Sequence, residues 1–210
     1  ILLSNICLID RKIIKEGQRI TASAYGIKYT YKINFDGLHQ AINSLAVLGS
    51  LLISKRDVKK GISNLYKVAL PIGRGNRHTL FINGKKSLLI DDSYNANPSS
   101  VIASLNSFKE IAVNNRKVLI LGEMGELGKH SLFLHKKLYD YLINLNINLV
   151  IFVGKNTKDL YNLSKNKIES AWAESSEQII KKDIIKLIKP MDTILIKGSR
   201  YMKMEVIVNY

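Results

Sequence analysis

The stretch Asp-Asp-Ser-Tyr-Asn-Ala-Asn-Pro occupies residues 91–98 and directly follows the apolar run Ser87-Leu88-Leu89-Ile90. This pattern predicts a short buried strand that runs into two carboxylates, a hydroxyl, a phenol and two amides. Burying such groups without hydrogen-bond partners costs about 1–3 kcal/mol each. Capping of a following helix accounts for one or two of them, because Asp, Ser and Asn all serve as N-caps. The others indicate a ligand site, since open α/β sheets bind ligands at the carboxyl ends of their strands.

Short apolar strands alternate with helical patterns on both sides of this stretch. The predicted strands are Thr79–Ile82, Ser87–Ile90, Lys117–Leu121, Asn148–Val153, Ile168–Ala173 and Thr193–Ile196. The predicted helices are Ser99–Ile111, Ser131–Leu145, Asn156–Ser164, Glu174–Leu187 and a last one after Arg200. Asn83-Gly84 is typical of a hairpin turn between the first two strands. The alternation predicts an α/β fold with a mostly parallel sheet and helices on both faces.

The chain before this region has a different pattern. Partial alternation over residues 18–35, interrupted by Tyr25-Gly26, predicts a β-hairpin. Apolar residues spaced by three and four predict a helix from His39 to Ile53, and a second short helix is expected over Asp57–Leu65. The Gly- and Pro-containing segment Pro71 to Arg77 is the best candidate boundary. We therefore expect two domains, residues 1–72 and 73–210.

The charge of the chain requires an explanation, because 210 residues carry a formal net charge of +15. The basic residues are spread along the chain, without an Arg-rich block or interleaved aromatic residues. This distribution argues against nucleic acid as a partner. It fits better with attraction of an anionic substrate. No stretch reaches the roughly 20 apolar residues that a membrane-spanning helix needs.

The single cysteine, Cys7, cannot form an internal disulfide and suits a reducing compartment such as the cytoplasm. It lies in the apolar run Ile1 to Ile9, so we expect a buried, structural thiol. That run has no basic residues before it and no cleavage site of small residues, and we do not expect it to be a signal peptide. The absence of an initiator Met suggests that the chain is cut from a longer protein.

Polar loops follow four of the predicted strands, and in a parallel sheet these loops should meet at one edge. They are 91–98, 122–128, 154–157 and 197–200. Lys197-Gly198-Ser199-Arg200 could bind a phosphate or carboxylate, or it could be surface charge. We expect Gly122 to Gly128 to be a structural turn, in which Glu123 and Glu126 orient neighbouring groups. His135 fits a packed histidine better than a metal ligand, because no Cys or paired carboxylates lie at ligand spacing.

Together these motifs resemble one family, the Mur ligases. Asp-Asp-Ser-Tyr-Asn-Ala-Asn-Pro is followed by Gly-Glu-Met-Gly-Glu-Leu-Gly at 122–128 and by Lys-Gly-Ser-Arg-x-Met-x-Met-Glu at 197–205. Upstream, Gly37 to Ala46 is similar to the family's Gly-x-His-Asn-x-x-Asn-Ala segment, with Gln40 in place of its second Asn. Gly73-Arg74 is similar to the family's domain junction. The resemblance covers about Ile20 to the end and is strongest to the members that add D-alanyl-D-alanine.

The resemblance implies the tail of an α/β central ATPase domain followed by a Rossmann-like C-terminal domain. It further implies that ATP phosphorylates the terminal carboxylate of UDP-MurNAc-tripeptide and that the amine of D-alanyl-D-alanine attacks the acyl phosphate. The residues implied in nucleotide binding are Asn43, Arg74, Asp92 and Asn95. Those implied in substrate binding are Tyr94, Asn97, Lys197, Ser199 and Arg200. The glycines beside Arg74 would permit a hinge for domain closure, and the enzyme is expected to be a monomer.

Some parts of the family pattern are absent from this sequence. The nucleotide loop Gly-Thr-x-Gly-Lys-Thr, the carbamylated lysine and the Mg²⁺ ligands would belong upstream of Ile1. We therefore expect no catalytic residue or metal ligand here, and no ligase activity from these 210 residues alone. Two alternatives stay open. The chain could be a catalytically dead nucleotide-binding or interaction module, or it could belong to another ligase of the Mur type, or a folylpolyglutamate synthase, with the same fold.

Overall fold

The computed structural model describes residues 5–112 and 114–210. It consists of two compact units, Ile1–Leu70 and Pro71–Tyr210. This division falls at the start of the Gly- and Pro-containing segment, two residues before the boundary expected from the sequence. The first part of the Ile1 to Ile9 run lies outside the described residues, so the expectation about a signal peptide is not addressed by the structure.

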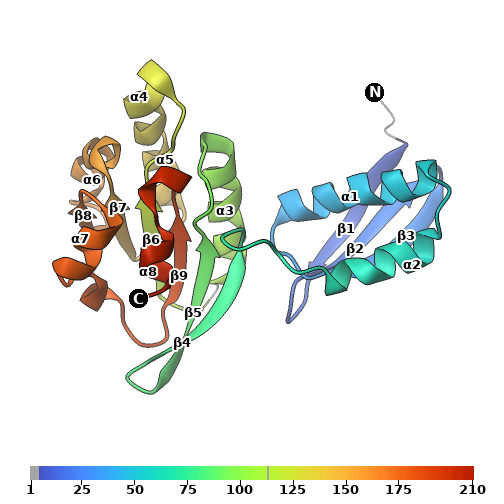
Figure 1. The fold of residues 1–210 in the computed structure, drawn as a ribbon, viewed down its shortest axis with the longest axis horizontal. Coiled ribbons are helices and arrows are strands. Elements are labelled where there is room, and N and C mark those ends of the chain that lie inside the picture. The colour runs from blue at the N-terminus through green and yellow to red at the C-terminus, as the bar shows by residue number, and fades with distance from the viewer. Residues whose placement is uncertain (1–4, 113) are drawn as a thin grey trace. The chain divides into compact units, whose positions relative to one another are not determined.

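The first unit is an antiparallel sheet covered by two helices (Figure 1). Its elements are β1 (Ile6–Ile13), β2 (Gln18–Ala24), β3 (Ile27–Ile33), α1 (Leu38–Ile53) and α2 (Val58–Asn64). The predicted hairpin is confirmed as β2–β3. Asp57, expected in the first turn of the second helix, precedes it as the N-cap and accepts a hydrogen bond from the backbone N–H of Lys60 at 3.0 Å. Strand β1 was not expected from the sequence.

The prediction that Cys7 is buried is wrong, because the thiol is exposed. Cys7 lies on β1, where Ile6 and Leu8 pack against the core of the first unit. Successive side chains of a strand point to opposite faces. Cys7 therefore points away from the helices, and an apolar run of this kind does not reveal which of its members face solvent.

The second unit contains a six-stranded sheet in the order β4-β5-β9-β6-β7-β8. The strands are β4 (Asn76–Ile82), β5 (Lys85–Asp92), β6 (Lys117–Gly122), β7 (Leu149–Val153), β8 (Glu169–Ala173) and β9 (Thr193–Lys197). Only the β4–β5 hairpin is antiparallel within this described sheet. The expected α/β fold with a mostly parallel sheet is thus confirmed. The last strand of the chain, β9, lies in the middle of the sheet.

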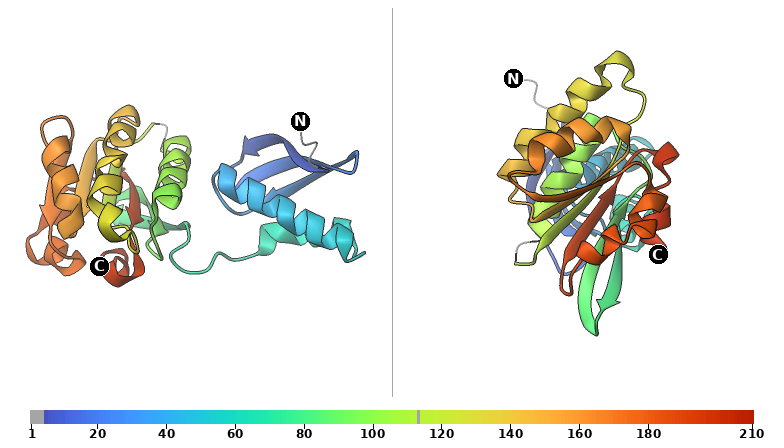
Figure 2. Two further views of the ribbon diagram at one scale, coloured as in Figure 1. Left: turned by 90° about the horizontal axis from the view of Figure 1, so that it is seen from above. Right: turned by 90° about the vertical axis from the view of Figure 1, so that its left-hand side faces the viewer.

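Helices cover both faces of this sheet (Figure 2). They are α3 (Pro98–Ile111), α4 (Ser131–Lys136), α5 (Leu138–Asn144), α6 (Lys158–Ser164), α7 (Ser176–Lys181) and α8 (Glu205–Val208). One core packs α3, α5 and α6 against the sheet through residues such as Phe108, Leu142 and Leu160. The other core packs α7 and α8 against the opposite face through Ile179 and Ile207.

Three predicted boundaries need correction. The helix expected over Ser131–Leu145 is interrupted at Lys137. The helix expected over Glu174–Leu187 ends at Lys181, because Asp183 adopts a left-handed conformation with φ of 56° before a 3₁₀ turn at Ile184–Leu187. Strand β5 continues through Asp91 and Asp92, which the sequence placed in a loop. Pairing with Ile196 and Lys197 of β9 extends the strand.

The amino-terminal edge of the parallel strands is held by a charged cluster around Arg116. Its guanidinium donates to Asp192 at 2.9 Å and to Glu169 at 2.9 Å. The Asp192 side chain is 1% exposed, whereas that of Glu169 is 51% exposed. The same Asp192 oxygen also accepts from the backbone N–H of Lys189 at 2.7 Å. Asp192 therefore fixes the start of β9, and Glu169 lies at the periphery.

Asp192 and Glu169 allow a matched test of how burial changes the stability that an ion pair provides, since both contact the Arg116 guanidinium at 2.9 Å. Asp192→Asn should lower the free energy of unfolding by about 2–3 kcal/mol, because it leaves a partly buried cation less compensated. Glu169→Gln should change it by less than about 1 kcal/mol, as for exposed ion pairs. Urea unfolding of the two variants measures both values, and equal losses would contradict this reading of the cluster.

Candidate functional site at the carboxyl edge of the parallel sheet

The polar loops that follow the parallel strands meet at one edge of the sheet, as predicted. Ser199, after β9, donates to the backbone carbonyl of Ala96 at 3.1 Å and accepts from the backbone N–H of Gly125 at 2.5 Å. Asn156, after β7, donates its backbone and side-chain N–H groups to the carboxylate of Glu123 at 2.9 and 2.7 Å. Hydrogen bonds therefore connect all four loops into one polar surface.

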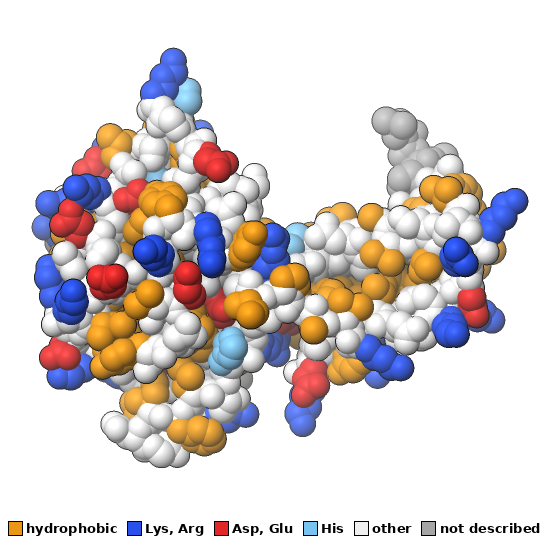
Figure 3. Space-filling model, viewed as in Figure 1, with side chains coloured by type: hydrophobic (Ala, Val, Ile, Leu, Met, Phe, Trp, Pro, Cys, Tyr) orange, Lys and Arg blue, Asp and Glu red, His pale blue; other side chains and the backbone are white. Residues whose placement is uncertain are grey.

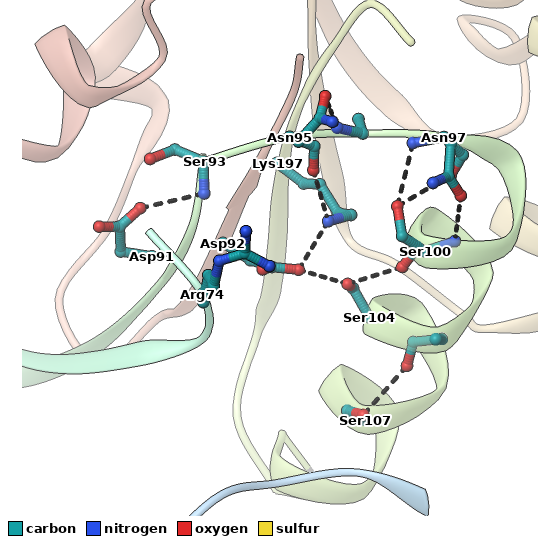
Figure 4. A network of polar contacts seen from close by, with 12 residues as sticks. Arg74, Asp91, Asp92, Ser93, Asn95, Asn97, Ser100, Ser104, Ser107 and Lys197 are labelled. Carbon is teal, nitrogen blue, oxygen red and sulfur yellow. Dashed lines mark hydrogen bonds and ion pairs between the residues drawn. The ribbon is translucent and has the colours of Figure 1, made fainter. Parts of the chain in front are cut away.

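Local hydrogen bonds shape the segment after β5 (Figure 4). Asp91 is buried and accepts from the backbone N–H of Ser93 at 3.1 Å. Asn95 accepts from the backbone N–H of Ala96 at 2.8 Å. Asn97 is the N-cap of α3, where it and Ser100 form a reciprocal capping box. Capping thus accounts for the Asn97 carbonyl oxygen, as expected for one or two members of the motif.

Asp92 and Lys197 form an ion pair across β5 and β9, in which the lysine is buried and the carboxylate partly buried. The Lys197 ammonium donates to Asp92 Oδ2 at 2.8 Å and to the backbone carbonyl of Asn95 at 3.0 Å. The hydroxyl of Ser104, on α3, donates to the same Asp92 oxygen. Lys197 is only 3% exposed and Ser199 only 2%. Both side chains, expected from the sequence to face a substrate, are directed into the protein.

Two other predicted site residues reach solvent around the ring of Tyr94. The Arg74 guanidinium lies 4.3 Å from the centroid of this ring, and the Arg200 guanidinium lies 5.9 Å from it. The Tyr94 residue is 43% exposed and the Arg200 side chain 66% exposed. Arg200 also contacts Glu205 at 3.4 Å. Guanidinium groups that stack on an aromatic ring keep their N–H edges available, which suits recognition of a phosphate or carboxylate.

The backbone around Arg74 is attached to this same edge. Gly73 accepts a hydrogen bond from the Tyr94 backbone N–H at 3.0 Å, and Gly75 donates to the Asp91 carbonyl at 2.7 Å. Both glycines have positive φ, and a Cβ at Gly73 would lie 2.9 Å from the Tyr94 nitrogen. Glycine is therefore required for this close approach, which places Arg74 beside Tyr94. Asn43 belongs to the first unit, where it is exposed on α1.

Glu123 organises the middle of the edge, in the orienting role expected for it. Besides Asn156, it accepts from the hydroxyl of Tyr201 at 2.7 Å. Burial and the hydrogen bond to Glu123 both raise the pKa of Tyr201, so this phenol stays protonated. Sequence reasoning missed Asn156, Tyr201 and Ser104 as parts of the site. Asn156 and Tyr201 lie within or beside the polar loops that it identified, but nothing in the sequence predicts the helix residue Ser104.

His135 is fully buried beneath the turn after β6, which confirms the expectation of a packed histidine. Its Nε2 accepts from the backbone N–H of Met124 at 2.9 Å, so Nδ1 carries the proton and donates to the Ser131 carbonyl at 2.7 Å. Burial lowers the pKa of His135, while the Ser131 carbonyl and the charge of Glu123 oppose that effect. A neutral imidazole therefore supports the 122–128 turn.

Three further observations concern the described residues as a whole. Within the described residues, no group of three His, Cys, Asp or Glu side chains is placed to hold a metal ion. On the face drawn in Figure 3, Lys and Arg side chains are scattered over both units rather than gathered in one patch. Among the described helices, none is long and apolar enough to cross a membrane.

A mostly parallel α/β sheet with polar loops at its carboxyl edge is a Rossmann-like arrangement, and open α/β sheets in general bind ligands at that edge. The model of the family described as "Mur ligase, glutamate ligase domain" matches residues 77–200. This match covers more than half of the 210 residues, and the chain belongs to the Mur ligase family.

Relatives with the same name match nearly the whole chain. The UDP-N-acetylmuramoyl-tripeptide–D-alanyl-D-alanine ligase of Rickettsia prowazekii is 38% identical over 178 residues, which are 85% of this chain and 38% of the relative. The ligase of that name from Bacillus subtilis is 31% identical over 206 residues, which are 92% of this chain and 42% of the relative. The chain thus spans about two-fifths of the length of these curated relatives.

Solved structures support the fold. A crystal structure of MurF from Acinetobacter baumannii has a TM-score of 0.83 at 21% identity, covering 98% of this chain and 44% of that one. MurF ligase from Thermotoga maritima, solved in complex with ADP, has a TM-score of 0.76 at 22% identity, covering 98% of this chain and 45% of that one.

The buried histidine predicts a pH dependence of stability. Because the folded-state pKa of His135 is lowered, the unfolded chain takes up the proton first as pH falls. The stabilisation that the neutral His135 provides should be complete above the pKa of the histidine in the unfolded chain, which is about 6.5, and should be lost as pH falls through the folded-state pKa. Urea unfolding between pH 8 and 5 should show that His135→Gln flattens this decline. The exposed His78 supplies the control variant His78→Gln, and equal slopes in the two variants would count against the assignment.

The Asp92–Lys197 pair predicts a large effect on stability. Lys197→Met should lower the free energy of unfolding by about 3 kcal/mol, because it leaves the Asp92 carboxylate without its cation in a buried setting. Lys186 offers a matched control, since its ammonium lies at the same 2.8 Å from Asp183 but its side chain is 73% exposed. Lys186→Met should have little effect. Comparable losses in the two variants would refute a special role for burial at Lys197.

Proposed function

We propose that this chain is the C-terminal part of an ATP-dependent ligase that adds D-alanyl-D-alanine to UDP-MurNAc-tripeptide in peptidoglycan biosynthesis. The observation that carries the proposal is the joint occurrence, at one sheet edge, of the 91–98 motif, Arg74 and the Lys197–Arg200 motif, in a chain whose matching relatives carry that name. We further propose that the enzyme works in the cytoplasm, where ATP and nucleotide-linked sugars are available, and acts as a monomer.

The proposed reaction has two steps. The terminal carboxylate of the tripeptide attacks the γ-phosphorus of ATP, which releases ADP and leaves an acyl phosphate. The amine of D-alanyl-D-alanine then attacks the acyl carbon, and the tetrahedral intermediate loses inorganic phosphate and a proton to give the amide. Phosphoryl transfer of this kind depends on positioning and on cations that stabilise the phosphate oxygens.

The site residues fit complementary roles in this scheme. For the nucleotide we propose Asn43, Arg74, Asp92 and Asn95, because a guanidinium suits phosphate oxygens and a carboxylate accepts from ribose hydroxyls. For the dipeptide we propose Tyr94, Asn97 and Arg200, since the exposed Arg200 guanidinium suits a free carboxylate. Lys197 and Ser199, which the resemblance implied in substrate binding, support the site from the interior through their contacts with the carbonyls of Asn95 and Ala96.

Mg²⁺ would accompany ATP by neutralising charge on its phosphates. The described residues bring no three candidate ligands together, so we assign no metal-binding role to this chain. The 210 residues also contain no Gly-x-Gly-Lys-Thr loop for the β- and γ-phosphates. Two alternatives are a nucleotide-binding or interaction module without catalysis, and a Mur-type ligase with another acceptor.

The test is a fusion of this chain to the upstream three-fifths of the Rickettsia prowazekii relative, assayed by mass spectrometry for the pentapeptide product. We expect ATP-dependent product with D-alanyl-D-alanine, and none with D-glutamate or a diamino acid. We expect no turnover from the 210 residues alone, because that chain lacks the phosphate loop. A folded fusion that forms no product with any acceptor would support the inactive module, and product with another acceptor would support the second alternative.

A further inference from the structure

Lys197 is a buried cation in the middle of the candidate site, and its surroundings are unlike those of a substrate-binding lysine. We propose that Lys197 is a positioning residue for the nucleotide side of the site: it fixes the Asp92 carboxylate and the 93–97 loop rather than binding the acceptor dipeptide. The inference rests on the proposed function for the identity of the ligands, but the contacts that carry it are independent of that proposal.

The first argument is the burial and pairing of the Lys197 ammonium, two of whose three N–H groups have acceptors within the protein. One of its protons goes to Asp92 Oδ2 at 2.8 Å and another to the Asn95 carbonyl at 3.0 Å. The Lys197 side chain is 4% exposed. A substrate carboxylate could reach it only by displacing Asp92, which would leave a partly buried carboxylate without its cation, and that loss is costly. Figure 4 shows the ammonium directed toward Asp92 and the backbone of Asn95.

The second argument concerns the Asp92 carboxylate, whose two oxygens differ in their hydrogen bonds. Lys197 and Ser104 both donate to Oδ2, so that oxygen is fully engaged. No donor among the described residues contacts Oδ1, and the Asp92 side chain is 21% exposed. The two donors on Oδ2 therefore fix the rotamer of the carboxylate, while its other oxygen stays available as an acceptor. A ribose hydroxyl is a donor of the right kind for such an oxygen.

The third argument is the attachment of the loop itself. The carbonyls of two successive residues, Asn95 and Ala96, are held by Lys197 and Ser199 from the end of β9. Ser199 in turn accepts from Gly125. The end of β9 therefore sets the path of the backbone that carries Asn95, which we propose to face the nucleotide. Tyr94 and Asn97 have attachments of their own, to the Gly73 carbonyl and in the capping box with Ser100. Without the ammonium, one of these two attachments is lost and Asp92 becomes unpaired at the same time.

The test separates positioning from substrate binding and from a merely structural role. In the fusion enzyme, Lys197→Met should raise the KM for ATP roughly tenfold or more, because small misplacements of binding groups have effects of this order. The KM for D-alanyl-D-alanine should stay within about twofold of the parent value. The control Lys186→Met should change neither constant.

Rescue by a charged isostere keeps the test valid if Lys197→Met folds poorly. The chain has one cysteine, the exposed Cys7, so Lys197→Cys can be made in a Cys7→Ser background, with any cysteine of the upstream part of the fusion also replaced by Ser, and alkylated while unfolded. Reaction with 2-bromoethylamine forms a thioether, releases bromide and restores an ammonium on a stem of lysine length. Bromoethane gives the uncharged counterpart. We expect the charged product, and not the uncharged one, to restore the KM for ATP.

The remaining outcomes would overturn the proposal. A rise in the KM for the dipeptide alone would make Lys197 a substrate contact. Loss of kcat in proportion to the folded fraction, with both KM values unchanged, would make it structural only. If the parent fusion is inactive, the proposed function fails instead. The amide resonances of residues 94–97 in the 210-residue chain then decide, and unchanged resonances in Lys197→Met would refute positioning.

Discussion

The structure of the site depends on the insertion of β9 between β5 and β6. This parallel pairing places Lys197 directly beside Asp92, two residues that are 105 positions apart in the sequence. A lysine that enters a sheet interior needs a carboxylate and further acceptors there, and Asp92 and the Asn95 carbonyl meet that need. The same strand end delivers Ser199 to the Ala96 carbonyl, and Arg200, the next residue, returns to solvent. The polar character of the 91–98 motif thus follows largely from what β9 brings to it.

The cations at this edge fall into two groups, one buried and one exposed to solvent. Lys197 and Ser199 face the interior, where they hold the loop, while Arg200 and Arg74 flank the exposed ring of Tyr94. The 122–128 turn is held in a similar way. Glu123 accepts hydrogen bonds from Asn156 and Tyr201. His135 accepts one from the backbone N–H of Met124. The site therefore has a rigid, internally paired base and a cationic, solvent-facing rim. Under the proposed function, such a base would limit the reorganisation needed for an anionic ligand to bind at the rim.

The sequence predicted the β2–β3 hairpin, the strands of the second unit, most helices and the edge at which the polar loops meet, because those features depend on local apolar periodicity and on the rule for parallel sheets. It did not predict β1. It could not predict that Lys197 and Ser199 point inward, since that depends on which strands neighbour β9, and strand order is not encoded locally. For the same reason it extended the loop back to Asp91, although pairing with Ile196 keeps that residue in β5. The prediction that Cys7 is buried was wrong because an apolar run does not specify which face of a strand is covered. His135 was predicted correctly, since a lone histidine without nearby ligands is usually a packed one.

The central claim is that the carboxyl edge of the parallel sheet, organised by the Asp92–Lys197 pair, is the nucleotide-facing surface of this chain. The most direct measurement is an NMR titration of the ¹⁵N-labelled 210-residue chain with ADP. The account predicts that the shifted amide signals belong to residues 73–75, 92–97 and 197–200. Signals that shift instead at the opposite edge, around Arg116 and Asp192, or no shifts at millimolar ADP, would contradict it.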